Sequence, residues 1–480
     1  MRRITILALL LAAAIGLKGN DLDSCFRALA GDPLVRYGNL GICFYDMQAD
    51  TIVAAWRPYD QRTPASNMKV VTCAAALNLL GNDYTFATDV ALVGSQYADG
   101  TYIGNILITG GGDPTLGSDH FSGRPDFAGS IVDALQRRGI KRLEGTVEYA
   151  SRYNVVDTYC NDWTADDLAW DWGPECRPFN YSDNCFELTL NVGRRGITIA
   201  EMSKKIPNFA IDNRCSLVAK GGGTTPSLFR GIGDHTLQLR GRLNRDLGTV
   251  KLGVSMPSPE AYFATVLLDS IRARGIEITN KNARHFLDTV PLMTYRSPAL
   301  RDIARSALVR SDNMMTEAIL RAIAAESAGL WEGTTAADSI AGFYAADNID
   351  MRALSQSDGS GLARRNAVTP LFMCQAIDYA LRRDRHFAEL MPVMGVNGTL
   401  RNMLKGTPYE GKVAAKSGSM SRVLAYSGCY PADAPRFAFS IISNDFRGPL
   451  STMRGKIERV LCDVLPHLDQ IMAPNTQKDD

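Results

Sequence analysis

Pro64-Ala65-Ser66-Asn67-Met68-Lys69-Val70-Val71-Thr72-Cys73-Ala74-Ala75-Ala76-Leu77 is the stretch from which the fold and the chemistry of this chain can be predicted. Pro64 suits the first turn of a helix, because its missing N–H would have no partner there. The apolar run 70–77, with its three alanines, predicts a buried helix. Ser66 and Lys69 are three residues apart and therefore lie on one helix face, near the positive end of the helix dipole. A neutral lysine beside a serine can take the hydroxyl proton and so create a nucleophile.

Two further motifs follow in a fixed order. Ser311-Asp312-Asn313 stands at the head of a predicted helix, and Lys416-Ser417-Gly418-Ser419 lies in a predicted strand. A Ser-x-x-Lys spacing alone arises by chance in long sequences. Three such elements in this order, however, correspond to the Ser-x-x-Lys, Ser-Asp-Asn and Lys-Thr-Gly signatures of penicillin-binding proteins and serine β-lactamases, with Ser417 in the place of the threonine.

Length and composition indicate a globular protein of several domains. The 480 residues exceed the usual size of a single core, so two or three domains are expected. Hydrophobic residues make up 45% and charged residues 21%, which are ordinary globular values. Lys and Arg number 52 against 51 Asp and Glu, and this balance gives no indication of a nucleic-acid partner.

The N-terminus predicts export. Arg2-Arg3 forms a basic region, and the apolar segment 4–17 is short for a membrane span. We therefore expect a cleaved signal peptide over residues 1–19 and a periplasmic location, with an uncleaved anchor as the alternative. No later segment offers about 18 uninterrupted apolar residues, so the body is predicted to be soluble, with peripheral membrane association or none.

The cysteines and histidines suggest no metal site. The ten cysteines permit disulfides in an exported protein, but their pairing stays open. Four of them, at positions 160, 176, 185 and 215, cluster without zinc-ligand spacing, and Cys73 is expected to be a buried thiol. The five histidines show neither metal nor catalytic-triad spacing, so no cofactor is expected.

The pattern along the chain alternates between strands and helices. Predicted strands cover residues 39–46, 51–56, 88–93, 105–109, 413–416, 425–429 and 437–443, and predicted helices cover 300–308, 316–328 and 452–465. The loop Gly110–Pro114 is rich in glycine, but no Gly-Lys-Ser/Thr follows it, so a nucleotide site is not indicated.

Two similar segments predict an interrupted domain. Residues 133–140 and 269–276 each indicate a helix that ends at a glycine, Gly139 or Gly275, and is followed by a strand. Their spacing suggests one α/β domain interrupted at about residues 151–249. This interrupting piece is rich in aromatic residues, for which a core role is favoured over a sugar-binding surface.

Together these motifs resemble the low-molecular-mass class C penicillin-binding proteins of the D-alanyl-D-alanine carboxypeptidase/endopeptidase type, peptidase family S13. The resemblance covers almost the whole chain after the leader. It includes Gly110–Leu116, Asp358–Leu362, Val368–Pro370 and Gly398–Leu400. Ser66 and Ser311 are 245 positions apart, and such a long insertion between the first two motifs is what this family looks like.

The resemblance implies an α/β fold with a transpeptidase-like domain, an antiparallel sheet covered by helices, split by two nested and mostly β or α+β inserted domains. The expected boundaries are residues 20–88 and 292–480 for the transpeptidase-like domain, 89–150 and 250–291 for the inserted domain, and 151–249 for the domain nested within it.

The resemblance also implies the role of each motif residue. Ser66 would attack the bond between two D-alanines, and Lys69 would take its proton. The lysine needs a pKa about 3 units below normal, which burial and the nearby Lys416 would provide. Ser311 would pass the proton to the leaving amine, and Asn313 would orient the substrate amide and Lys69.

The remaining motif residues would bind the substrate. Lys416 and Ser417, in the strand that also contains Gly418, would face the terminal carboxylate. The N–H groups of Ser66 and Ser419 would form the oxyanion hole. The family usually carries Lys-Thr-Gly, and Ser417 keeps the hydroxyl of that threonine but loses its methyl group.

The sequence therefore predicts an exported serine D,D-peptidase that acts on peptidoglycan stem peptides and is acylated by penicillins. The alternatives are a serine β-lactamase and a catalytically weak wall-binding or antibiotic-sensing module. A class A β-lactamase needs a deacylating glutamate, and no Glu-x-x-x-Asn loop lies in the expected place between Asn313 and Lys416. Carboxypeptidase and endopeptidase activity break the same kind of bond, and the sequence does not separate them.

Overall fold

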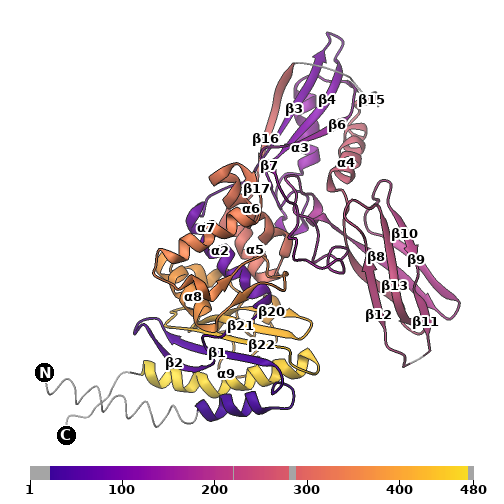
Figure 1. The fold of residues 1–480 in the computed structure, drawn as a ribbon. Coiled ribbons are helices and arrows are strands. Elements are labelled where there is room, and N and C mark those ends of the chain that lie inside the picture. The colour runs from indigo at the N-terminus through magenta and orange to yellow at the C-terminus, as the bar shows by residue number, and fades with distance from the viewer. Residues whose placement is uncertain (1–21, 220, 280–287, 474–480) are drawn as a thin grey trace, which may run out of the picture. The chain divides into compact units, whose positions relative to one another are not determined.

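The structure is a computed structural model that describes residues 22–219, 221–279 and 288–473 (Figure 1). The predicted signal peptide over residues 1–19 lies outside the described residues. The chain divides into two compact units. Unit 1 takes the chain up to Leu79, Ala304–Asp312 and the chain from Ala337 onward, and unit 2 takes Leu80–Ile303 and Asn313–Ala336.

Unit 1 is built on a five-stranded antiparallel sheet in the order β2-β1-β22-β21-β20. Its strands are β1 (Asn39–Asp46), β2 (Thr51–Trp56), β20 (Ala414–Met420), β21 (Val423–Tyr430) and β22 (Phe437–Asn444). All five were predicted from alternating or continuous apolar patterns. β21 and β22 are buried along their whole length, as expected for strands covered on both faces.

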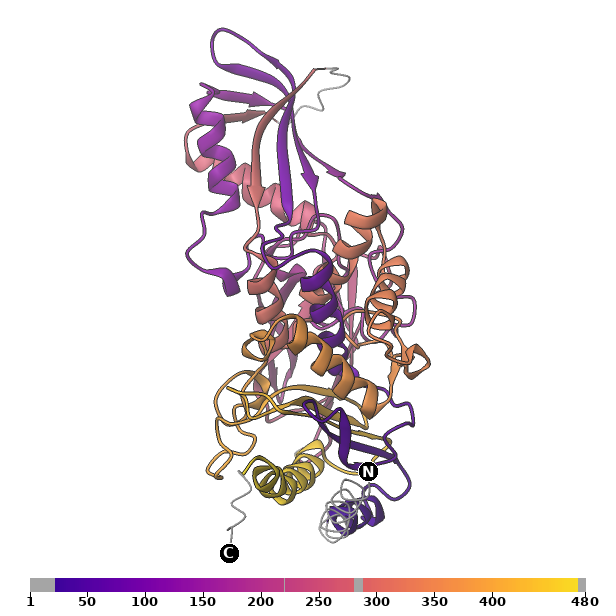
Figure 2. The same ribbon diagram turned by 90° about the vertical axis from the view of Figure 1, so that its left-hand side faces the viewer.

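Helices cover both faces of this sheet (Figure 1). On one face, a helix over residues 22–31 and α9 (Leu450–Met472) pack into a core that includes Phe26, Phe44 and Leu461. Figure 2 shows these two helices next to each other below the sheet. On the other face lie α2 (Met68–Leu79) and α8 (Pro370–Arg383), which pack against each other and, through α8, against the sheet.

Unit 2 contains two hydrophobic cores. The first lies between a six-stranded sheet and two helices, which are packed around Phe127 and Phe263. The strands are β3 (Ala87–Gln96), β4 (Thr101–Gly110), β5 (Arg142–Glu144), β6 (Val147–Ser151), β15 (Glu277–Thr279) and β16 (Thr289–Arg296), and the helices are α3 (Phe127–Arg137) and α4 (Pro259–Ala273). Gly139 and Gly275, which follow these helices, have φ values of 75° and 80°, in agreement with the predicted glycine ends.

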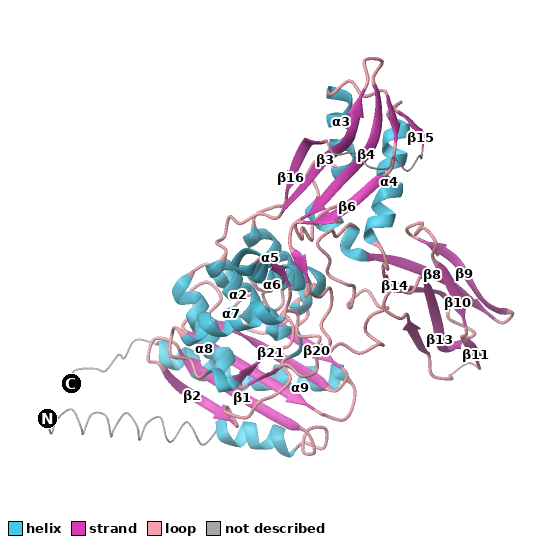
Figure 3. Cartoon of the chain, turned by 45° about the horizontal axis from the view of Figure 1, so that its top comes forward, coloured by secondary structure: helices cyan, strands magenta, loops and turns pink. Residues whose placement is uncertain are grey.

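The second core of unit 2 lies within residues 169–256 and is all β (Figure 3). One sheet contains β14 (Gly248–Ser255), β8 (Cys185–Gly193) and β9 (Gly196–Met202), and the other contains β10 (Ala210–Asn213), β11 (Ser216–Val218), β12 (Thr225–Phe229) and β13 (Thr236–Asn244). Leu188, Leu239 and Val254 are fully buried between them. The aromatic Phe186 belongs to this core, in line with the core role favoured above.

The chain enters and leaves the first core of unit 2 at neighbouring points. Ala87 pairs with Arg296, and the Ser297 N–H donates to the Phe86 carbonyl at 2.9 Å. This closure and the separate core within residues 169–256 support the nested arrangement. The domain boundaries given above stay a prediction.

The remaining helices are α5 (Leu300–Arg310), α6 (Asn313–Ala328) and α7 (Thr334–Ala345), with short strand pairs β7 (Asn154–Val155) with β17 (Leu330–Trp331) and β18 (Leu354–Ser355) with β19 (Ala367–Val368). None of the helices in the described residues combines the length and the apolar character that crossing a membrane requires.

Candidate active site

Ser66 lies in a tight turn in front of a helix and not within the α-helix itself. The turn is the 3-10 segment Ala65–Asn67, and α2 begins only at Met68. The predicted start of the α-helix at Pro64 is therefore wrong by one turn. The reason is local: Ala65 has a φ of 47°, a left-handed conformation that interrupts the helix before Ser66. Such strain in a non-glycine residue persists only where its surroundings enforce it, and it is common at functional sites.

Ser66 and Lys69 are brought together as predicted. The Lys69 Nζ lies 3.1 Å from the Ser66 Oγ, and the lysine side chain is completely buried while Ser66 is partly exposed. The same Nζ donates to the backbone carbonyl of Ser360 at 2.6 Å. These contacts, one to a carbonyl that only accepts and one to a hydroxyl that can also donate, help to hold the amine in place.

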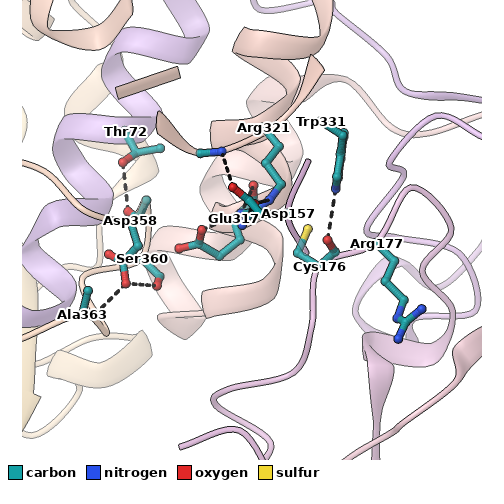
Figure 4. Close-up of polar contacts among 12 residues, drawn as sticks. Thr72, Asp157, Cys176, Arg177, Glu317, Arg321, Trp331, Asp358, Ser360 and Ala363 are labelled. Atoms are coloured by element: carbon teal, nitrogen blue, oxygen red, sulfur yellow. Dashed lines mark hydrogen bonds and ion pairs between the residues drawn. The ribbon is translucent and has the colours of Figure 1, made fainter. Parts of the chain in front are cut away.

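The loop Asp358–Leu362 holds this carbonyl in place, a role that the sequence reasoning did not assign (Figure 4). The Asp358 carboxylate is buried and accepts from the N–H groups of Gly361 and Ala363 at 2.7 and 2.6 Å and from the Asn366 side chain at 2.8 Å. A Cβ at Gly361 would lie 1.9 Å from the Ala65 carbonyl oxygen. The sequence Asp-Gly-Ser-Gly at 358–361 predicts a turn and contributes to the family resemblance, but it does not predict that this turn contacts Lys69.

A second hydroxyl–amine pair lies in the same unit. The Lys416 Nζ donates to the Ser311 Oγ at 3.0 Å and to the Ser417 carbonyl at 2.7 Å. Burial, reinforced by the positive charge of Lys69, lowers the pKa of Lys416 well below its usual range. Since two buried like charges repel, this pair of lysines holds its second proton weakly. Ser311, like Ala65, has a left-handed backbone, with a φ of 62°.

Strand β20 approaches the nucleophile turn at a glycine. A Cβ on Gly418 would lie 2.4 Å from the Pro64 carbonyl oxygen and 3.0 Å from the Ser66 nitrogen, so no other residue fits without a shift. β20 is the outer strand of the sheet, and every second N–H group of such a strand points away from its neighbour. Ser419, whose N–H is the expected second oxyanion donor, follows Gly418 directly.

Ser417 is partly exposed on this strand and has a hydroxyl partner. Its Oγ lies 2.7 Å from the Oγ of Thr399, which belongs to the turn Gly398–Leu400. That turn is one of the segments on which the family resemblance rests, and the resemblance implies no role for it.

Buried hydrogen bonds fix the nucleophile turn to the sheet. The Asn67 Nδ2 donates to the Ser427 Oγ at 2.8 Å, and the Ser427 Oγ lies 2.8 Å from the Ser440 Oγ. Just before the turn, Asn444 bonds to both the N–H and the carbonyl of Thr63 at 2.8 and 3.0 Å. The Asn67, Ser427 and Ser440 contacts are buried and those of Thr63 are partly buried, and together they fix the position of the turn.

Asn313 is the first residue of α6 and belongs to unit 2. Its Nδ2 donates to the backbone carbonyl of Trp172 at 2.6 Å. The expected contact with Lys69 therefore stays a prediction. Further along α6, the buried Arg321 bonds to Glu317 and Asp157, which ties the helix to the segment that follows β7 (Figure 4).

Thiols and metal-binding groups add little to this site. Cys73 is completely buried on α2 as predicted, and burial raises its thiol pKa to about 12, so it stays neutral. Within the described ranges, no group of three or more His, Cys, Asp or Glu side chains is placed to hold a metal ion.

Comparisons with known proteins agree with this geometry. The chain belongs to the D-Ala-D-Ala carboxypeptidase 3 (S13) family, which matches residues 23–461. A D-alanyl-D-alanine carboxypeptidase from an Actinomadura species is 27% identical over 469 residues, covering 92% of this chain and 84% of the relative. The D-alanyl-D-alanine carboxypeptidase DacB of Haemophilus influenzae is 26% identical over 414 residues, covering 81% of this chain and 82% of the relative.

The solved structure of penicillin binding protein 4 (dacB) from Haemophilus influenzae has the same fold. It superimposes with a TM-score of 0.78 at 21% identity, covering 93% of this chain and 99% of that one. The predicted α/β fold of the penicillin-binding proteins and the predicted peptidase family are thereby confirmed. The protein is an enzyme of the D-Ala-D-Ala carboxypeptidase class.

Proposed function

We propose that Ser66 is the nucleophile of this peptidase and that it forms an acyl-enzyme with peptidoglycan stem peptides ending in D-Ala-D-Ala. The observation that carries the proposal is the pair of buried lysines, Lys69 and Lys416, each about 3 Å from a serine hydroxyl. Burying an ammonium group is costly unless its proton can leave. Two such groups beside two hydroxyls are therefore suited to proton transfer.

In the first step, the Ser66 Oγ forms a bond to the carbonyl carbon while its proton moves to the neutral Lys69 Nζ. The negative charge on the carbonyl oxygen is stabilised by the N–H groups of Ser66 and Ser419, which is supported by the close approach at Gly418. The Ser360 carbonyl keeps the Lys69 amine in place throughout.

In the second step, the C–N bond breaks and the departing amine of the terminal D-alanine takes up a proton. The Ser311 hydroxyl delivers it and is resupplied by Lys416, whose Nζ lies 3.0 Å away. Asn313 orients the substrate amide. Water then attacks the acyl-enzyme, its proton passes through the Ser311 hydroxyl back to Lys416, and the Ser66 oxygen leaves with the proton that Lys69 had taken up. When the departing amine belongs to a cross-linked peptide, the same steps amount to endopeptidase activity.

The terminal carboxylate of the substrate binds to Lys416 and to the hydroxyl of Ser417 on β20, a strand whose Gly418 leaves room for the peptide. An anionic carboxylate raises the proton affinity of a nearby amine, so Lys416 becomes protonated as substrate binds. Penicillins present a carboxylate next to a reactive amide and are expected to acylate Ser66. The related Haemophilus influenzae protein has been solved in complex with a β-lactam.

The residues before the described structure support export. The basic Arg2-Arg3 and the apolar segment that follows have the composition of a signal peptide, and the substrate lies outside the cytoplasmic membrane. We therefore place the mature protein in the periplasm, with peripheral membrane association or none, and with no nucleic-acid partner.

Labelling with a fluorescent penicillin tests the proposal. The wild type should carry one label per chain, Ser66→Ala none, and a Ser357→Ala control the full amount. Mass spectrometry of muropeptides incubated with the wild type should show loss of terminal D-alanine. Label that survives in Ser66→Ala, or labelled protein that never alters muropeptides, would contradict the assignment; the second result would favour the antibiotic-sensing module, and rapid penicillin hydrolysis would favour a β-lactamase.

A further inference from the structure

We propose that Thr399 is a positioning residue that orients the Ser417 hydroxyl toward the substrate carboxylate. The inference rests on the proposed function of Ser417. The observation behind it is the 2.7 Å distance between the Thr399 Oγ1 and the Ser417 Oγ, in which either atom is able to donate. Both residues belong to unit 1 and both reach the surface, where a carboxylate in solution can approach them.

The Ser417 hydroxyl needs such a partner because a serine side chain has three accessible rotamers on a strand. A hydroxyl carries a single proton, and it binds a carboxylate well only when that proton points at the anion. If Thr399 donates to the Ser417 Oγ, the Ser417 proton is left for the substrate, and the donated hydrogen bond also polarises it.

Thr399 is itself held firmly by the residues on either side. Gly398 has a φ of 56°, and a Cβ there would lie 2.6 Å from the Val309 carbonyl oxygen, so the position admits only glycine. Leu400 is 2% exposed, and its carbonyl accepts from the Gly395 N–H at 3.0 Å. In this turn Gly398 allows the close approach to Val309, Leu400 is buried and fixes the backbone, and Thr399 between them presents its hydroxyl to Ser417.

Kinetics with an acylated D-Ala-D-Ala peptide test the inference. Since a hydrogen bond of this kind is worth up to about tenfold, Thr399→Val should raise KM about fivefold and leave kcat within a factor of two. Thr399→Ser should restore the wild-type KM. The control Thr407→Val, eight positions further along the chain from Thr399, removes a hydroxyl that donates to the Leu404 carbonyl and should leave KM unchanged.

The effect of Thr399→Val on KM, measured with serine and with threonine at position 417, distinguishes a positioning role from a general loss of structure. A threonine at position 417 fixes its own hydroxyl, because β-branching restricts the side-chain rotamer. In the Ser417→Thr background, Thr399→Val should therefore change KM by less than twofold. For a peptide whose terminal carboxylate is replaced by an amide, Thr399→Val should have no effect in either background.

An equal rise of KM in both backgrounds, an equal effect on the amide peptide, or no effect of Thr399→Val at all would overturn the inference. If the wild type released no D-alanine, the proposed function would fail. The wild type, Thr399→Val, Ser417→Thr and the double variant would then be compared by the concentration dependence of penicillin labelling. Penicillin also carries a carboxylate, so the predicted coupling between positions 399 and 417 remains measurable.

Discussion

Lys416 in unit 1 and Arg321 in unit 2 are both buried cations, but their surroundings differ. Lys416 contacts a hydroxyl and a carbonyl and, within the described part of the chain, no carboxylate. Arg321 bonds to Glu317 at 2.8 Å and to Asp157 at 2.5 Å. Burial alone lowers the pKa of both, but around Arg321 the charge of Glu317, together with Cys176 and Asp157, outweighs it and raises the pKa.

The difference separates a cation that releases its proton from one that keeps it. Arg321 stabilises α6, the helix that begins at Asn313, and its charge is permanent. Lys416, whose contacts within the described residues are a hydroxyl and a carbonyl, is instead suited to exchange a proton with the serine beside it. A buried lysine next to hydroxyls is thus an indication of chemistry, and a buried arginine between carboxylates is an indication of architecture.

The largest expected effect comes from making a unit 1 cation permanent. Lys69→Arg keeps the positive charge but removes the ability to accept a proton, so the rate of penicillin acylation should fall on the order of 10³-fold. Stopped-flow labelling with a fluorescent penicillin measures it. Lys412→Arg, an exchange of the same kind at an exposed position, should react like the wild type. If the acylation rate of Lys69→Arg were within tenfold of the wild-type rate, another group would have to take the proton from Ser66.

The second prediction exchanges each cation for methionine. Arg321→Met leaves Glu317 buried without its partner and should lower the free energy of unfolding by about 3–5 kcal/mol. Lys416→Met removes a charge that burial disfavours, so stability should be unchanged or higher while penicillin acylation is lost. Urea unfolding followed by tryptophan fluorescence compares the two. Equal destabilisation by both exchanges would show that Lys416 is also a structural cation.

The third prediction concerns a buried acid in unit 2 without full compensation. Asp113 is completely buried, its Oδ2 has no hydrogen-bond partner, and burial raises its pKa from 3.8 to about 6 despite bonds from Thr115. Because the folded state holds the proton more tightly, its stabilising contribution is complete below pH 3.8 and is lost as the pH rises through 6. A shift of this size corresponds to about 3 kcal/mol.

Urea unfolding of the wild type and Asp113→Asn from pH 4.5 to pH 8 tests this. Relative to the variant, the wild type should lose stability over that interval, mostly between pH 5 and 7, and the difference should be flat above pH 7. Asp99→Asn, which replaces an exposed acid at the turn before β4, is the matched control and should show no such slope. If the free energies of unfolding of the wild type and Asp113→Asn changed in parallel with pH, burial would impose no cost on the ionisation of Asp113.

Much of this molecule could be predicted from sequence, and the limits have physical causes. The first motif predicted that Ser66 and Lys69 meet, because their spacing of three residues places them on one face, whereas the contact between Ser311 and Lys416 was not predicted. No short spacing links the loop Asp358–Leu362 or Thr399 to the residue that it contacts. Ser360 of the loop lies 291 positions from Lys69 and acts through its backbone carbonyl. Thr399 lies 18 positions from Ser417 and acts through a single hydroxyl. The sequence predicts helix at Ala65, where the structure has a left-handed backbone. Local propensity does not predict this conformation, because Ala65 packs against Gly361 and Gly418, which are distant in the sequence.

The smallest expected effect tests how neutral hydrogen bonds, in contrast to ion pairs, maintain the site. The Thr72 Oγ1 on α2 donates to the Gly359 carbonyl at 2.9 Å, next to the Ser360 carbonyl that holds Lys69 (Figure 4). Thr72→Val keeps the shape and leaves a buried acceptor without this donor, so unfolding should become easier by about 1–2 kcal/mol.

The same exchange should slow penicillin acylation by only a few fold, because the Asp358 carboxylate still holds the loop through three other donors. Thr72→Ser, which retains the hydroxyl, should recover the acylation rate even though it loses a methyl group from the core. Labelling rates and urea unfolding of both variants separate the two contributions. If Thr72→Val slowed penicillin acylation as much as Lys69→Arg does, this neutral hydrogen bond would matter to the site of unit 1 as much as the ion pairs around Arg321 matter to unit 2.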